Sequence, residues 1–173
     1  MNIATNKAVI NSAYSLKKFN NAYESYIINF FGEFCKYKDE IYEKKIFLKN
    51  LFNPKIINFL PKYGKIKSRI SFLIIFLMSF FPLNRLLKKE RPDFLVIHLI
   101  TSLPIILFLI FNYRTKLILR VSGFPKLNLF RKLLWKIGEK NFLFITTPTT
   151  ETYKNLCKKN IFSERKIHYL PDP

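Results

Sequence analysis

The sequence predicts an α/β fold, with a Rossmann-like, doubly wound sheet of mostly parallel strands. Apolar runs of strand length alternate with helical segments along the 173 residues, as they do in consecutive βαβ units. The runs at 94–99, 116–121 and 142–146 are apolar throughout, which is typical of parallel strands that helices cover on both faces. Hydrophobic residues make up 49% of the chain, enough to fill such a core.

The N-terminal half is expected to hold two helices and two strands. The expected elements are a helix over 6–19, strands over 26–30 and 45–49, a loop over 50–66 and a helix over 68–88. Thr5 or Asn6 can cap the first helix, which has Val9 and Ala13 on one face. Pro82 predicts a bend in the second helix, because a proline removes a helical hydrogen bond. The apolar residues of this second helix are Ile70, Leu73, Ile74, Leu77 and Phe81.

Beyond a turn at 91–93, strands and helices alternate up to the C-terminus. The strands are expected over 94–99, 116–121, 142–146 and 167–170, and the helices over 103–112, 127–137 and 149–158. An alternative is a membrane-spanning helix over 94–113, because these twenty residues carry no formal charge. Thr101 and Ser102 can cap a helix and Pro104 suits its first turn, which favours a strand followed by a helix.

The formal charge of +19 predicts attraction to polyanions such as nucleic acid, anionic lipid headgroups or phosphorylated substrates. No recognised nucleic-acid-binding module occurs in the sequence, so nucleic acid is not expected as a partner. Two histidines, and two cysteines without a CxxC pair, argue against a zinc site. The N-terminus has no basic stretch followed by an apolar one, so we expect no signal peptide and a cytoplasmic protein.

Parallel sheets bind ligands at the carboxyl ends of their strands, so the residues that end or follow the predicted strands are the site candidates. Arg120 lies at one strand end, and Ser122 and Gly123 form the turn after it. A guanidinium and backbone amides can together hold a phosphate or the oxygens of a sugar. The alternative for Arg120 is a structural role, in which it satisfies carbonyl groups or pairs with an acid.

Two further candidates are less specific. His98 lies in an apolar strand and is either a buried neutral histidine or a catalytic base. Glu33 follows Gly32 at a strand end, where it is either a site carboxylate or a solvated surface residue. The GxGxxG fingerprint and the GxxxxGK[ST] phosphate loop are both absent, so no cofactor is expected in this chain. No catalytic residue is assigned.

The predicted helix over 127–137 and the residues after it carry a basic row. Its members are Lys132, Lys136 and Lys140 at four-residue spacing, with Arg131 beside them. The other face of the helix carries Leu127, Phe130, Leu134 and Ile137. A basic amphipathic helix can lie on an anionic membrane surface. The alternative is a helix packed on the core with a solvated lysine face.

Three stretches carry a resemblance to a known family: RPDFLVIHLITSLPIILFL (91–109), TKLILRVSGFPKLNLFRKLLWK (115–136) and IHYLPDP (167–173). They resemble the N-terminal half of bacterial family 4 glycosyltransferases, and the RxSGxPK pattern resembles members that act in surface-polysaccharide synthesis. The resemblance implies one half of a GT-B fold. It also implies transfer of a sugar from a nucleotide-sugar donor to a polysaccharide or lipid-linked acceptor, as in lipopolysaccharide and other cell-envelope glycans. Arg120, Ser122, Gly123 and Lys126 would line the acceptor cleft, and Ser122 stands about where the family has a histidine.

The resemblance also implies what this chain lacks. The family's first strand is expected to be missing, and so is the C-terminal domain, which would bind the nucleotide-sugar. The 173 residues are therefore expected to be inactive alone, at the inner face of the bacterial plasma membrane, with a glycan or lipid-linked acceptor and the anionic membrane surface as partners. Two alternatives remain: a non-catalytic subunit that pairs with a separately encoded donor domain, and a membrane protein without catalysis.

Overall fold

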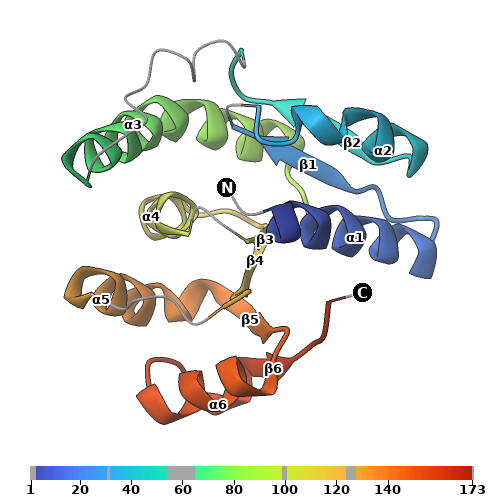
Figure 1. Ribbon diagram of the computed structural model, residues 1–173. Coiled ribbons are helices and arrows are strands. Elements are labelled where there is room, and N and C mark those ends of the chain that lie inside the picture. Colours follow the sequence, from blue (N-terminus) through green and yellow to red (C-terminus); the bar gives the residue numbers. More distant parts are fainter. Residues whose placement is uncertain (1–2, 31, 54–64, 99–100, 124–127, 173) are drawn as a thin grey trace. The chain divides into compact units, whose positions relative to one another are not determined.

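The computed structural model describes residues 3–30, 32–53, 65–98, 101–123 and 128–172 (Figure 1). It confirms the α/β prediction, because every strand pair within it is parallel. The chain divides into two compact units, Met1–Leu83 with Asp172–Pro173 and Asn84–Pro171. The strands form two sheets rather than the single predicted one, since none of the described strands pairs with strands of both units.

The first unit is built on a pair of parallel strands. Its elements are α1 (Ile3–Phe19), β1 (Tyr26–Asn29), α2 (Lys38–Glu43), β2 (Phe47–Asn50) and the larger part of α3 (Lys65–Glu90). The register runs from Tyr26 opposite Phe47 to Asn29 opposite Asn50. A core cluster between the strands and the first two helices consists of Ile10, Ile27, Phe34, Ile41 and Ile46.

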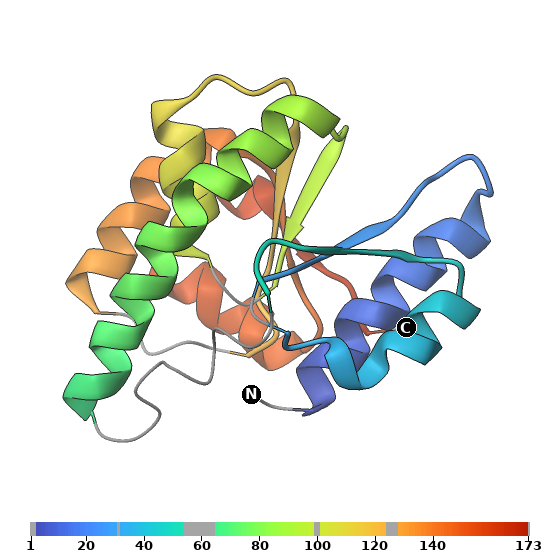
Figure 2. The ribbon, with the colours of Figure 1, turned by 90° about the horizontal axis from the view of Figure 1, so that it is seen from above.

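One expectation for the helices of this unit needs correction. Asn6 lies inside α1, which begins at Ile3, and therefore does not cap it. Leu73, Leu77 and Phe81 of α3 are exposed, at 56%, 59% and 73% of their surface. Figure 2 shows α3 as one continuous helix, and Pro82 lies within it.

The second unit is a four-stranded parallel sheet in the order β3-β4-β5-β6. Its elements are β3 (Phe94–Ile97), α4 (Ser102–Ile110), β4 (Lys116–Arg120), α5 (Leu129–Gly138), β5 (Phe142–Thr147), α6 (Thr150–Lys159) and β6 (Ile167–Tyr169). Each helix joins two neighbouring strands, and right-handed crossovers of this kind place successive helices on the same face. Figure 1 shows α4, α5 and α6 in a row beside the strands.

Local signals in the sequence set the ends of these helices. Asn128 caps α5, because its side chain accepts a hydrogen bond from the backbone N–H of Arg131 at 2.8 Å. Thr149 caps α6 in the same way, through the N–H of Thr152 at 3.2 Å. Asn160 ends α6 in the left-handed conformation, with φ of 48°, which asparagine tolerates better than most residues.

The uncharged stretch over 94–113 is not one helix. It forms β3 and α4, joined by a connection that lies partly outside the described residues, so the strand-and-helix prediction is confirmed and a span over 94–113 is wrong. Among the helices that the structure describes, none has the length and apolar character needed to cross a bilayer.

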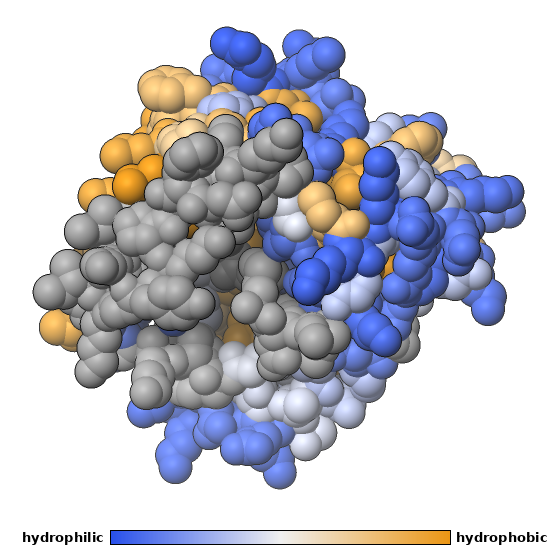
Figure 3. Space-filling model, turned by 45° about the horizontal axis from the view of Figure 1, so that its top comes forward, coloured by the Kyte–Doolittle hydropathy of each residue, from blue (hydrophilic) through white to orange (hydrophobic). Residues whose placement is uncertain are grey.

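The buried face of α5 also differs from the prediction. Leu134 is buried as expected, but Phe130 and Ile137 are 64% and 49% exposed, and Trp135 and Gly138 are buried in their place. Trp135 stacks on Phe162 with 5.4 Å between the ring centroids. The packing of Trp135 and the close approach at Gly138 decide which side of α5 turns inward. Phe130 and Ile137 of α5 consequently remain on the surface. The view in Figure 3, which does not label elements, also shows hydrophobic surface on its left side.

Candidate functional site

The carboxyl edge of the four-stranded sheet brings together most of the described site candidates. Arg120 is the last residue of β4, and its side chain is only 4% exposed. Its Nη2 donates to the carbonyl oxygen of Leu170 at 3.0 Å, and its Nη1 to Oγ1 of Thr146 at 3.4 Å. Arg120 therefore connects the ends of β4 and β5 with the segment that follows β6.

Backbone hydrogen bonds extend this edge beyond the strands. The N–H of Val121 donates to the carbonyl of Thr146 at 2.8 Å, and the N–H of Leu170 donates to the carbonyl of Thr147 at 2.9 Å. The edge is thus a rigid base, on which the residues after Val121 are positioned.

Ser122 and Gly123 follow this base and are exposed. A Cβ atom built on Gly123 would meet no heavy atom within 4 Å, so the space beside its backbone is open. Exposed amides in a turn at a strand end can donate to the oxygens of a ligand. The prediction for Lys126 lies outside the described residues.

His98 lies at the same edge, directly after β3. The register pairs Ile97 with Leu119, so one further residue along each strand places His98 opposite Arg120. The His98 side chain is half-buried, and its Nδ1 atom is buried. The edge therefore places an imidazole next to the strand that carries the guanidinium.

Glu33 belongs to the other unit, where it closes the turn after β1. Its Oε1 accepts a hydrogen bond from the N–H of Phe30 at 3.0 Å, and its carbonyl accepts one from Nδ2 of Asn6 at 3.2 Å. Gly32 has φ of 95° in this turn, a conformation that favours glycine. The contacts of Glu33 are those of a turn-forming residue.

Sequence reasoning did not single out two polar residues at the strand ends. Thr146 is 8% exposed and accepts the hydrogen bond from Arg120, and Asn29 is fully buried. The Asn29 side chain donates to Oδ1 of Asn50 at 2.6 Å and accepts from the N–H of Gly32 at 3.1 Å. The available signal was a polar residue at the end of an apolar strand, which marks a buried hydrogen-bond partner.

Three of the four basic residues on or just after α5 are open to solvent. Lys132, Lys136 and Lys140 are exposed, whereas Arg131 is half-buried. The structure therefore places the three lysines where a polyanion can reach them.

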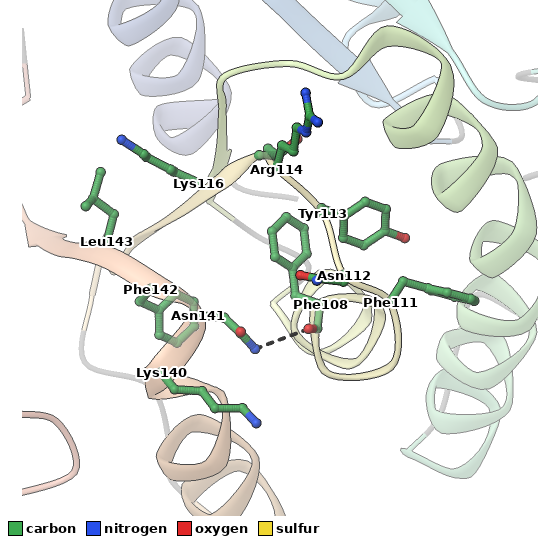
Figure 4. Close-up of a pocket in the computed structure, with 11 residues that line it drawn as sticks. Phe108, Phe111, Asn112, Tyr113, Arg114, Lys116, Lys140, Asn141, Phe142 and Leu143 are labelled. Carbon is green, nitrogen blue, oxygen red and sulfur yellow. Dashed lines mark hydrogen bonds between the residues drawn. The ribbon is translucent and has the colours of Figure 1, made fainter.

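A hollow of about 310 Å³ lies at the other edge of the sheet, near the starts of β4 and β5 (Figure 4). Two of its polar side chains already have partners within the fold: Asn141 donates to the carbonyl of Phe108 at 3.3 Å, and Tyr113 donates to Oδ1 of Asn84 at 2.6 Å. Burial raises the pKa of Tyr113 to about 12, so its hydroxyl stays protonated. The carboxyl edge, with its open turn, is the better candidate for a ligand site.

The candidate site is thus a ligand-binding edge rather than a recognised catalytic arrangement. It offers a serine hydroxyl and the backbone of the exposed residues 122–123, with His98 directly after the neighbouring strand β3. These donors suit phosphate or sugar oxygens. In comparisons of the chain with known proteins, no family model matches it and no curated protein matches it.

Proposed function

We propose that this chain is the acceptor-binding half of a glycosyltransferase. In this proposal a sugar passes from a nucleotide-sugar donor to a polysaccharide or lipid-linked acceptor in bacterial cell-surface glycan synthesis. The observation that carries the proposal is the open Ser122–Gly123 turn at the carboxyl edge of a parallel sheet. This is the edge at which open α/β sheets bind ligands. The proposal also draws on the resemblance of the segment over 115–136.

Donor binding is assigned to a separate domain. The chain has no glycine-rich phosphate loop of the kinds that hold nucleotides. Among the described residues at the carboxyl edge, no nucleophile is paired with a general base. The chain alone is therefore proposed to bind acceptor without turning over. A donor domain beyond these 173 residues would complete the cleft.

Titration of the ¹⁵N-labelled chain with a short-chain prenyl pyrophosphate that carries one sugar tests the proposal. The amide signals of Ser122 and Gly123 are expected to shift, because a phosphate or sugar oxygen accepts from them. A uridine diphosphate sugar is expected to leave these signals unchanged. Gly123→Val should weaken acceptor binding by filling the open space, whereas Lys154→Ala on α6 should not.

Two results would overturn this proposal. One is transfer or hydrolysis of a nucleotide-sugar by the purified chain, which would place donor binding in these residues. The other is an acceptor titration that shifts signals elsewhere and leaves 122–123 unchanged.

A further inference from the structure

Helix α5 presents an unusually apolar surface to solvent. Leu129, Phe130, Leu133 and Ile137 are 88%, 64%, 59% and 49% exposed. These four residues, the α5 stripe, fall on one side of the helix, because positions three and four apart lie above one another. The sequence placed Phe130 and Ile137 on one apolar face with Leu134 and left open whether that face meets a membrane or the core, and the fold shows that Phe130 and Ile137 are exposed while Leu134 is buried.

The stripe cannot turn inward by rotation of the helix. Leu134, Trp135 and Gly138 are buried on the opposite side, and Trp135 stacks on Phe162. A Cβ on Gly138 would lie 2.6 Å from Cγ2 of Ile105 in α4, so any other residue at this contact would force Ile105 or the helix to shift. The inner face is fixed by close packing, and the stripe therefore stays outside.

Lysines border the stripe on the same outward side. Lys132 and Lys136 are exposed, and helical geometry places Lys136 next to Leu129 and Leu133 around the helix. Lys140 follows the helix and is exposed as well. No acidic residue occurs within Leu129–Gly138. The outward face of α5 thus consists of an apolar half and a cationic half.

We propose that this face of α5 docks on an anionic lipid bilayer. The α5 stripe lies at the boundary of headgroups and acyl chains, and Lys132 and Lys136 lie at the level of the lipid phosphates. A helix with one apolar and one cationic side is suited to lie in this interface. The proposal is independent of glycosyl transfer, since it concerns a helix surface and not the carboxyl edge of the sheet.

Other occupants fit this face less well. A second copy of the chain brings the same lysines into the interface, and like charges across an interface oppose association. The phosphates of a nucleic acid would bind the lysines, but four large apolar side chains would have no apolar surface to cover them. An anionic bilayer satisfies both halves of the face.

Sedimentation of the full chain with vesicles tests the docking. Vesicles of phosphatidylcholine with one part in about four of phosphatidylglycerol should bind it, and pure phosphatidylcholine should bind it much less. Because the chain carries a charge of +19, part of its binding to anionic vesicles is non-specific. Matched variants are needed to separate this part from docking through α5. Lys132→Ala/Lys136→Ala should weaken binding roughly thirtyfold, as two lysines near an anionic surface supply about this factor.

The charge control is Lys154→Ala/Lys158→Ala. These two exposed lysines have the same spacing on α6 and remove the same charge. This variant should bind nearly as well as the unaltered chain. Phe130→Ala/Leu133→Ala tests the stripe, keeps the charge and should weaken binding roughly tenfold or more. All of these substitutions are at exposed helix positions, and their thermal transitions verify that the fold is retained.

A depth measurement separates insertion from adsorption. The fluorescence of Phe130→Trp should be quenched by lipids brominated in the acyl chains, whereas Thr150→Trp at the exposed start of α6 should not be. Trp135 is present in both variants and gives the same background.

Three results would overturn the proposal. They are equal losses from the α5 and α6 lysine pairs, unchanged binding of Phe130→Ala/Leu133→Ala, and equal quenching of the two tryptophan variants. A chain that sediments as a dimer until Phe130 and Leu133 are replaced would assign the face to a second copy instead.

Discussion

At the residue scale, Arg120 combines a structural and a site position. Its guanidinium is buried and donates to Thr146 and to Leu170, and the turn at Ser122 and Gly123 starts just beyond it. The sequence left open a structural role for Arg120, and its hydrogen bonds to the Leu170 carbonyl and the Thr146 hydroxyl are contacts of that kind. The turn that depends on this anchor, rather than the guanidinium itself, is the part open to a ligand.

Replacing Arg120 tests the anchor. Arg120→Met should lower the free energy of unfolding by about 2 kcal/mol, since hydrogen bonds from a charged donor are lost. It should also speed hydrogen exchange at the N–H of Leu170, which bonds to Thr147 in the same connection. Urea unfolding and amide exchange measure the two effects.

Arg165→Met is the matched control, because Arg165 is exposed and its loss should leave both measurements unchanged. Wild-type stability and exchange in Arg120→Met would contradict the anchoring role.

At the scale of elements, the contact between α4 and α5 depends on one glycine. Gly138 lies at the end of α5, where a Cβ would come within 2.6 Å of the branched side chain of the fully buried Ile105. The closeness of these helices also fixes which side of α5 is exposed. A packing contact inside the unit therefore creates the surface proposed to meet the membrane.

Gly138→Ala should destabilise the protein. Overpacking of a core typically costs about 1–3 kcal/mol, and the better helix propensity of alanine recovers up to about 1 kcal/mol of it. The net loss should be about 1 kcal/mol, measured by thermal or urea unfolding. Gly123→Ala serves as the control, because its Cβ would meet nothing within 4 Å. Equal stability of the two variants would show that the helices adjust without cost.

At the scale of the whole molecule, the two sheets differ in the number of strands that stabilise them. Among the described residues, the first unit has one strand pair, whereas the second has four strands in one sheet, with a register shift between β4 and β5 at Leu117/Ile118. An isolated two-stranded sheet has little stability by itself, and a sheet of three or more strands has more. The second unit therefore provides the more stable part of the fold.

Hydrogen exchange of the native protein tests this difference. The amides of β1 and β2 should exchange about tenfold faster, or more, than those of β4 and β5, because the smaller sheet opens at lower free energy. Both pairs consist of hydrogen-bonded parallel strands, so they are of the same kind. Both are measured in one sample, so the conditions are identical. Equal protection in the two sheets would mean that the chain unfolds as one cooperative body.

The sequence by itself determined the type and order of most of the described elements, but not α2, and it indicated the edge of the candidate site. These depend on local signals: apolar runs of strand length, caps such as Asn128 and Thr149, and residues that follow strand ends. It also placed Arg120, Ser122 and Gly123 together, because they are neighbours in the chain.

Only the tertiary structure decided how the sheet divides, which side of α5 is buried and what Arg120 contacts. Leu170 lies 50 residues from Arg120, and their hydrogen bond exists because β4, β5 and β6 lie next to one another in one sheet. Periodicity identifies the apolar side of a helix, but the neighbours decide whether that side is buried. In α5 the close contact at Gly138 outweighs the apolar pattern, and the more hydrophobic side faces outward.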